Sequence, residues 1–335
     1  MLGIDIREID VHDEAVLHEW WATGRDGQAD RAYDVYPAWE HSRTALVDDT
    51  PEHDLTLIAA YDSSADGGGM VGIGLVELPL LDNTHAAWID VDVPPAHRGH
   101  GVGAALLERV EQMARDAGRT HSIAAAFTPP GGTSAGARFA AAHGYEVANT
   151  EGFKVLDLHD HPDWAPLDER VARRIGRYRI VEWDTLTPEE HVADLARAIS
   201  TFVSMVPTGD LALEDGEWTP ERYLDNERRG AVRNRRFAAA AIAPDGELVG
   251  YTDLTVSRAK TTQGTVGITF VLPAHRGHAL GLAVKLANHR SLQAALPKCE
   301  FVRTSNADVN AHMNAVNEQM GYRQVEDILE VQKTL

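Results

Sequence analysis

Cysteine, long apolar runs and an excess of basic residues are all missing from this chain of 335 residues. Its one cysteine, Cys299, excludes an intramolecular disulfide and fits a reducing cytoplasm. No apolar run approaches the roughly 18 residues that span a bilayer, and Met1–Glu14 lacks the basic start of a secretory signal. The chain has 31 Lys and Arg against 51 Asp and Glu, a net charge of −20. We therefore expect neither nucleic acid nor membrane as a partner, because both reward basic patches.

The sequence does contain an internal repeat. The pentapeptide Ala-His-Arg-Gly-His begins at Ala96 and again at Ala274, 178 residues later. Gly144-Tyr145 recurs 177 residues later as Gly321-Tyr322. Matching landmarks at a near-constant offset of about half the chain indicate duplication of a whole domain.

The pattern of apolar residues predicts a mixed α/β (α+β) fold in each half. We expect domains over 1–158 and 177–335, joined by a charged, proline-containing linker over 159–176. In the first half, strands are predicted at 4–9, 55–61, 70–78, 86–93, 122–127, 145–147 and 153–158, and helices at 13–24, 104–117 and 135–142. In the second half, strands are predicted at 178–181, 237–243, 248–256, 265–272 and 301–304, with helices from 188, at 280–295 and at 310–320. No element is predicted after Met320.

Each pentapeptide lies between a strand and a helix and is rich in glycine. Glycines allow close backbone approach, and the amides at a helix N-terminus attract an anion, so a pyrophosphate is the natural ligand. A dinucleotide fingerprint is an alternative for Gly99-x-Gly101-x-x-Ala104, but several strands precede it. A P-loop would need Gly-Lys-Ser/Thr, which is absent. A purely structural turn remains an alternative for one copy.

Arg98-x-x-Gly101-x-Gly103, after Val-x-Pro and before an amphipathic helix, resembles the acyl-CoA motif of the GNAT N-acetyltransferase superfamily. Arg276-x-x-Ala279-x-Gly281 fits the same motif with one glycine replaced by alanine. The chain thus resembles a tandem GNAT protein, in an organisation similar to that of mycothiol synthase. The resemblance implies two domains, each with a mixed, mostly antiparallel sheet flanked by helices, and acetyl-CoA as cosubstrate without a metal.

The resemblance also implies which residues hold CoA. They are the loop residues and the strand ends before them in both halves, with two asparagines in the second: Val91, Val93, Arg98, Gly99, His100, Gly101, Val102, Gly103, Ala104, Val271, Arg276, Gly277, His278, Ala279, Leu280, Gly281, Asn306 and Asn310. A backbone N–H near Val93 or Val271 would polarise the thioester carbonyl. Helix capping is the alternative role for the asparagines.

The implied reaction is acyl transfer from CoA to an amine, which a base must first deprotonate. Asp90 and Asp92 are candidate bases in the first half, and Asp253 is the nearest equivalent in the second. Solvated strand residues are the alternative for each. Family members often have a tyrosine four residues before Gly-Phe/Tyr, where Ala140 and Asn317 stand here.

The expected activity is transfer of an acetyl or other acyl group to a primary amine of a small-molecule acceptor. The alternatives are a non-catalytic acetyl-CoA-binding protein, or one structural and one catalytic domain. Because Asn306 and Asn310 provide a pantetheine-side turn, we expect the second half to carry catalysis. His159-Asp160-His161 is expected to be a solvated segment rather than a metal site. The sequence does not fix the oligomeric state and allows a homodimer.

Overall fold

The computed structural model describes residues 3–64 and 68–335, which fall into two compact units. The N-terminal unit comprises Met1–Thr150, Thr208–Glu214 and Ile328–Leu335, and the C-terminal unit comprises Glu151–Pro207 and Asp215–Asp327. The units are therefore interleaved along the chain, unlike the predicted continuous domains over 1–158 and 177–335.

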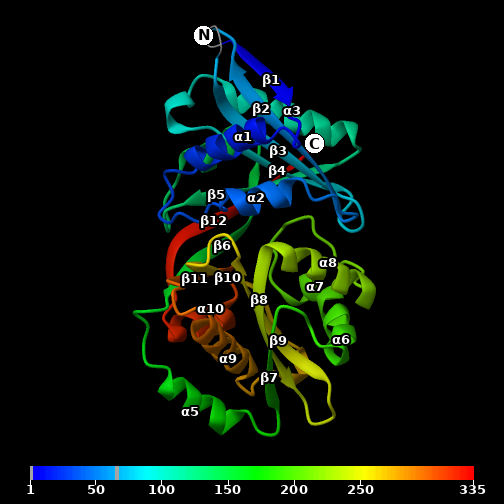
Figure 1. Cartoon of the computed structure of the whole chain (residues 1–335), viewed down its shortest axis with the longest axis vertical. Coiled ribbons are helices and arrows are strands. Elements are labelled where there is room, and N and C mark those ends of the chain that lie inside the picture. The colour runs from blue at the N-terminus through cyan, green and yellow to red at the C-terminus, as the bar shows by residue number, and fades with distance from the viewer. Residues whose placement is uncertain (1–2, 65–67) are drawn as a thin grey trace. The chain divides into compact units, whose positions relative to one another are not determined.

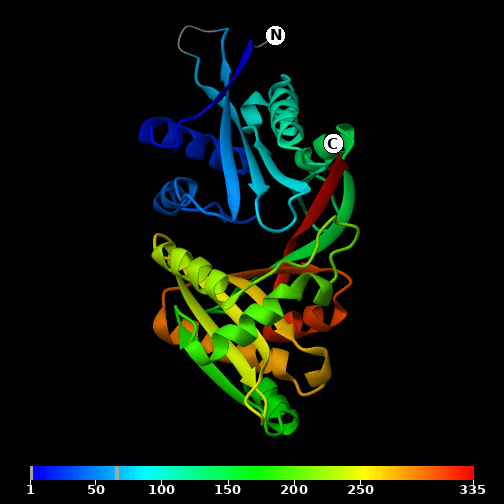
Figure 2. The same ribbon diagram turned by 90° about the vertical axis from the view of Figure 1, so that its right-hand side faces the viewer.

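The N-terminal unit is a sheet with helices on both faces (Figure 2). Its strands are β1 (Ile4–Glu8), β2 (His53–Asp62), β3 (Met70–Pro79), β4 (Ala86–Asp92) and β5 (His121–Thr128), in that spatial order. Neighbours are antiparallel except β4 and β5, which are parallel. Helices α1 (Glu14–Gly27) and α2 (Trp39–Leu46) lie on one face, and α3 (Val102–Asp116) lies on the other. Helix α4 (Ala135–Ala142) follows β5.

The core of this unit explains why the middle of β2 is a continuous run of apolar residues in the sequence. Leu57 and Ala59 pack with Leu17 and Trp20 of α1, whereas the alternate residues Ile58 and Ala60 pack with α3. Both faces of the strand are thus buried under helices. Asp13 caps α1 by accepting from the amides of its first turn, and the helix begins one residue after the predicted start.

The C-terminal unit repeats this order with β7 (Arg179–Asp184), β8 (Asn234–Ile242), β9 (Leu248–Ser257), β10 (Gln263–Val271) and β11 (Phe301–Ala307). Helix α9 (Leu280–Ala295) covers one face, and α6 (Glu189–Ser200), α7 (Phe202–Met205) and α8 (Pro220–Arg233) cover the other (Figure 1). Helix α10 (Ala311–Met320) follows β11. The shared strand order makes the two units duplicates, as the sequence repeat predicted.

Two twelve-residue strands have residues in both units: β6 (Glu146–Asp157) and β12 (Arg323–Thr334). The first residues of β6 belong to the N-terminal unit, and the rest pair with β11 in the C-terminal unit. The last residues of β12 follow β5 in the sheet of the N-terminal unit. The end of β12, which comes after the C-terminal half in the sequence, completes the N-terminal unit. The end of β6, which comes after the N-terminal half, completes the C-terminal unit. The sequence did not predict β12, and it predicted β6 as two short strands.

The predicted linker over 159–176 contains a helix, α5 (Ala165–Arg174). Trp164 is buried there, and its indole N–H donates to the carbonyl of Met320 at 3.0 Å. Leu167 and Val171 pack against the same core cluster. The proline and charge pattern predicts a connection because α5 is rich in charged residues and only partly buries its apolar residues.

Candidate functional site

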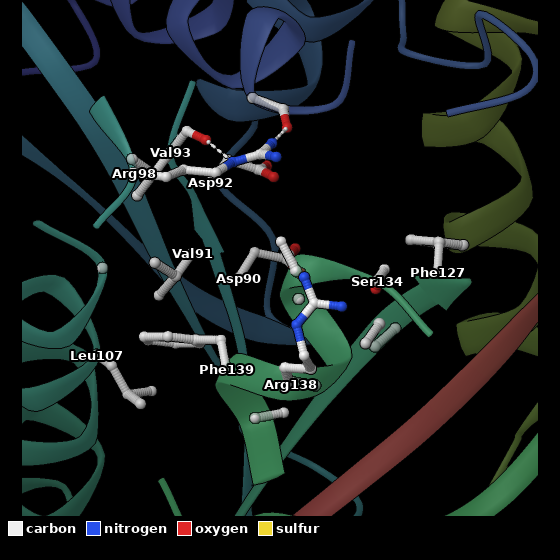
Figure 3. Close-up of a pocket in the computed structure, with 18 of the residues that line it drawn as sticks. Asp90, Val91, Asp92, Val93, Arg98, Leu107, Phe127, Ser134, Arg138 and Phe139 are labelled. Carbon is white, nitrogen blue, oxygen red and sulfur yellow. Dashed lines mark hydrogen bonds between the residues drawn. The ribbon is translucent and has the colours of Figure 1, made fainter. Parts of the chain in front are cut away.

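A cavity opens in the N-terminal unit where β4 and β5 separate. Their pairing runs from Ala86–His121 to Trp88–Ile123, while β4 continues to Asp92 and β5 to Thr128. The space beyond the last pair has a volume of about 650 Å³. It is lined by β4, β5, α3, α4 and the loops between them, together with Val331 of β12 (Figure 3).

The unpaired edge of β4 presents backbone amides to this cavity. The His85 carbonyl accepts from the amide of His121 in β5 at 3.1 Å. Since backbone groups of alternate residues point to the same edge of a strand, those of Val91 and Val93 also face β5. Beyond Trp88 no β5 residue pairs with them. The two predicted CoA-binding residues on β4 therefore line the opening.

The repeated loop forms the end of the cavity nearest the start of α3. Gly99 and Gly101 have φ of 78° and 88°, in the left-handed region that favours glycine. Gly101 is the N-cap of α3, no side chain caps it, and the first helical bond runs from Ala105 N to Gly101 O at 3.1 Å. The amides at residues 102–104 are thus left for a ligand, at the positive end of the helix dipole. This geometry suits a phosphate group.

A third glycine of this loop, Gly103, packs closely against α4. A Cβ at Gly103 would lie 3.2 Å from the ring of Phe139, so a larger residue would require this ring to move. Gly99, Gly101, Gly103 and Ala104 line the cavity. Val102 instead points into the core, and His100 is exposed.

Arg98 ties the loop to the end of α1. Its guanidinium donates to the carbonyls of Val93 at 2.9 Å and Gly27 at 2.8 Å, and it also pairs with the Asp30 carboxylate. Figure 3 shows this side chain beside Asp92 and Val93. Because these contacts use the guanidinium, Arg98 positions the loop amides.

Two carboxylates project from β4 on the face that carries α1. Asp90 is solvent-accessible in the cavity and accepts no hydrogen bond from the described part of the chain. Asp92 accepts from the side-chain amide of Gln28 at 3.2 Å. Both carboxylates are surrounded by protein although the cavity admits solvent, and this partial loss of water raises both pKa values. The charge of Asp90 helps to raise the pKa of Asp92 to about 7, and the charge of Glu77 helps to raise that of Asp90. Asp92 is therefore a carboxylate whose proton can exchange near neutral pH.

The opposite wall comes from α4 and the adjacent Tyr145. Ser134 caps α4 through a bond from the Ala137 amide at 3.1 Å, and Arg138 and Phe139 reach the cavity from the helix. Ala140, where the family often has tyrosine, lines the cavity and has no proton to give. The hydroxyl of Tyr145 is engaged by Ser122 at 2.7 Å and Glu111 at 3.1 Å.

The second loop, in the C-terminal unit, follows the same backbone path, but its arginine makes fewer hydrogen bonds that hold the loop in place. Gly277 has φ of 89°, and Ala279, the N-cap of α9, has φ of 57°, which is strained for a residue with a Cβ. Within the described chain, Arg276 has only a bond to the Val271 carbonyl at 3.3 Å, and His278 is exposed. Leu280 and Gly281 are buried in the helix packing.

Asp253 lies within the sheet of the C-terminal unit. Its carboxylate accepts from the Ile268 amide at 2.8 Å, beside a shift of the β9–β10 register between Val266 and Thr269. Gly267 is needed there, because a Cβ would lie 2.6 Å from the carboxylate. Burial raises the pKa of Asp253, and the nearby charge of Arg236 lowers it. These bonds give Asp253 a role in the bulge of β10.

The two predicted asparagines bond to their own segment. Asn310 caps α10 by accepting from the Met313 amide at 3.2 Å. Asn306 accepts from the Asn317 amide at 2.9 Å and donates to the side chain of Asn314. The capping alternative thus describes Asn310 in this structure.

Residues 14–145 match the family model described as the acetyltransferase (GNAT) family. They form a GNAT domain. No curated protein matches the chain in sequence. A tandem GNAT protein from the clavulanic acid biosynthesis pathway superposes with a TM-score of 0.80 at 24% identity, over 99% of this chain and 98% of that one.

Two further structures share the fold across the whole chain. A GCN5-related N-acetyltransferase from Sphaerobacter thermophilus has a TM-score of 0.67 at 16% identity, over 100% of this chain and 97% of that one. N-Myristoyltransferase of Saccharomyces cerevisiae with bound myristoyl-CoA has a TM-score of 0.59 at 10% identity, over 100% and 79%. The predicted tandem GNAT fold is confirmed, and the GNAT match indicates an acyltransferase.

Several cavity residues of the GNAT domain were not predicted. Gln28 and Asp30 follow α1, Arg138 and Phe139 lie on α4, and Val331 comes from β12. The only signal for Val331 was the 177-residue offset, which puts it in register with Lys154 of β6. Among residues 3–64 and 68–335, no three or more His, Cys, Asp or Glu side chains are grouped to hold a metal ion. No helix in those ranges is both long and apolar enough to cross a membrane.

Proposed function

We propose that the N-terminal unit transfers an acetyl group from acetyl-CoA to the primary amine of a small-molecule acceptor in the cytoplasm. The observation that carries this proposal is that an anion-binding loop, unpaired β4 amides and two carboxylates line a single cavity. Acetyl-CoA would supply the activated acyl thioester. Its pyrophosphate would bind the amides of Gly101–Ala104, and its pantetheine arm would lie between the separated strands.

The chain's own groups have distinct roles in this proposal. An amide of Val91 or Val93 would donate to the thioester carbonyl and stabilise the negative charge that forms on its oxygen. Asp90 has no competing hydrogen-bond donor in the described chain, so it would attract the ammonium of the acceptor and take its proton. Asp92 would strengthen the negative potential at this end of the cavity. The departing thiol has an ordinary pKa near 8.5 and tolerates the lack of an acid at Ala140.

This assignment reverses the expectation that the second half carries catalysis. Asn306 and Asn310 are occupied with their own turn, and Asp253 with the β10 bulge. The C-terminal loop also lacks the clamp that Arg98 makes with Gly27 and Asp30. We therefore assign catalysis to the N-terminal unit.

The test is CoA release from acetyl-CoA across a panel of amines with Gly101→Val and Ala279→Val. Both substitutions place a β-branched residue at a left-handed helix N-cap, and Gly101→Val adds the greater strain because Ala279 already has a Cβ. We expect Gly101→Val to reduce turnover by roughly tenfold or more and Ala279→Val to leave it within about twofold. The opposite pattern would assign catalysis to the C-terminal unit.

A non-catalytic acetyl-CoA-binding protein is a second candidate, favoured by alanine at position 140 and by the engaged hydroxyl of Tyr145. Calorimetric binding of acetyl-CoA that is lost in Gly101→Val, with no transfer to any amine, would support this candidate.

A further inference from the structure

The duplication lets each cavity residue of the N-terminal unit be compared with its equivalent in the C-terminal unit. Leu107 and Lys285 are both the sixth residue of the helix after the loop, in α3 and α9. We call β6 and β12 the exchanged strands, because the end of each completes the unit of the other half. Val331 and Lys154 are the ninth residues of β12 and β6. Leu107 and Val331 line the cavity of the N-terminal unit. Two lysines thus stand where that cavity has apolar side chains.

Both lysines are buried in the C-terminal unit. Lys285 is 1% exposed and Lys154 is 6% exposed. The Nζ of Lys154 donates to the carbonyl of Gly152 at 3.1 Å, and that of Lys285 lies 5.2 Å from the centre of the Tyr322 ring. Neither ammonium forms an ion pair with a carboxylate anywhere in the described chain. Burial lowers the pKa of Lys285 to about 7, and it also lowers the pKa of Lys154, although the nearby charges of Asp308, Glu151 and Asp327 act in the opposite direction. A carboxylate bound at the two amino groups would lessen the cost of burying their charge.

The N-terminal unit has a partly exposed lysine two residues after Val331 in β12, and this lysine is paired with an internal carboxylate. There Lys333 lies 5.5 Å from the centre of the Tyr145 ring, and its ammonium pairs with Glu111 at 2.7 Å. Glu111 is the tenth residue of α3, and the tenth residue of α9 is His289. His289 accepts or donates a bond with the Tyr322 hydroxyl at 2.6 Å and brings no negative charge. Burial and the charge of Lys285 lower the pKa of His289 to about 3, so His289 is neutral.

A third position shows the same change toward polarity. Ala140 and Asn317 each stand four residues before the glycine that ends their helix, Gly144 or Gly321. Ala140 lines the N-terminal cavity, whereas Asn317 is fully buried and its Oδ1 has no hydrogen-bond donor in the described chain. A buried polar atom without a partner is rare in folded proteins. Because this oxygen only accepts, it would bond to an N–H or O–H group of a ligand and not to its carboxylate.

We propose that the C-terminal unit binds a carboxylate at Lys285 and Lys154, in the region that corresponds to the acyl cavity of the N-terminal unit. The ligand carboxylate supplies the negative charge that Glu111 supplies in the N-terminal unit. The carboxylate can belong to a free organic acid or to an acyl-CoA whose acyl chain ends in a carboxylate. The chemistry of recognition is the same in both cases.

The experiment is calorimetric titration of the full chain with malonate, malonyl-CoA and acetyl-CoA. It compares the wild type with Lys154→Val/Lys285→Leu, which installs the residues of the N-terminal unit. Lys298→Met, which removes an exposed lysine, is the control. We expect the double variant to lose roughly tenfold or more of the affinity for malonate or malonyl-CoA, and the control to lose none. Loss for malonate indicates a free acid, and loss for malonyl-CoA alone indicates an acyl-CoA.

Equal affinities of wild type and double variant for malonate and malonyl-CoA, or no binding of either to the wild type, would overturn the proposal. If the double variant does not fold, thermal unfolding of the wild type with malonate and with neutral malonamide replaces it. Malonate alone should raise the melting temperature, and an equal response to both compounds contradicts the proposal. The malonate titrations do not depend on acyl transfer by the N-terminal unit, so the two proposals can fail separately.

Discussion

The side-chain amide of Gln28 donates a hydrogen bond to the carboxylate of Asp92 across 3.2 Å. Gln28 follows the last residue of α1, and Asp92 is the last residue of β4. A Cβ at neighbouring Gly27 would lie 2.9 Å from the Asp92 Cβ, so helix and strand are in direct contact here. This junction also carries the Arg98 bond to the Gly27 carbonyl. The end of α1 therefore holds both Asp92 and the loop that begins at Arg98 in position.

Replacing Asp90 tests the proposed base. Asp90→Asn keeps the size of the side chain but removes the group that attracts and deprotonates the ammonium. We expect kcat/KM for the amine to fall by about 100-fold, with acetyl-CoA affinity within about twofold of the wild type. Steady-state kinetics and calorimetry measure these effects, and Asp54→Asn, an exposed acid on β2, is the control. Retention of more than half the activity in Asp90→Asn would remove Asp90 from the mechanism.

Asp92 predicts a pH dependence. Its pKa is raised to about 7, so below that pH it holds a proton and the cavity attracts an ammonium less strongly. We expect kcat/KM to fall on acidification through pH 7 in the wild type, and Asp92→Asn to lack this step. Because the folded state binds this proton more tightly than the unfolded state, the wild type should also lose stability relative to Asp92→Asn as pH rises from about 4 to 7. A pH–rate profile and urea unfolding measure both, and an unchanged inflection in the variant contradicts the assignment.

Ala279 predicts an easy gain in stability. Its φ of 57° is strained for alanine, and glycine would relieve the strain. We expect Ala279→Gly to stabilise the C-terminal unit by about 0.5 kcal/mol or more, measured by urea unfolding. Ala283→Gly, four residues along in α9, should instead destabilise it by about 1 kcal/mol. Destabilisation by both changes would mean that the loop backbone differs in solution.

The strand exchange predicts that a substitution near the end of β6 or β12 destabilises the unit formed mainly by the other half of the sequence. Val331 and Leu156 are buried in β12 and β6, and each packs in the core of the unit that its strand end completes. We expect Val331→Asp to destabilise the N-terminal unit and Leu156→Asp the C-terminal unit, each by about 3 kcal/mol or more. Hydrogen exchange should show lost protection in β5 for the first variant and in β11 for the second. Lost protection in β11 for Val331→Asp would refute the exchange.

The tandem fold was predictable because local sequence determined its main landmarks. Gly99 and Gly101 need left-handed backbone, and the apolar faces of α3 and α9 follow the helical period. The candidate acids on β4 were also visible from strand alternation, which placed Asp90 and Asp92 on one face.

The parts that were missed depend on tertiary contacts. Nothing in β6 or β12 indicates which sheet each strand end joins, since both have the same length and similar burial. Gln28, Arg138 and Val331 enter the cavity from separate elements, so no spacing relates them. Lys285 sits in a helix whose other buried residues are mostly apolar, and only comparison with Leu107 makes it unusual.

The exchange of β6 and β12 also bears on biosynthesis. Residues Ile328–Leu335, which complete the N-terminal sheet beside β5, leave the ribosome only after every residue of the C-terminal unit has been made. Domains usually fold in the order of their synthesis, but here the first unit must wait with an open sheet edge next to β5. Until those residues are made, this edge lacks its partner from β12. A helper that shields such edges, or slow pairing by β6 in place of β12, would decide how much of the chain reaches its native state.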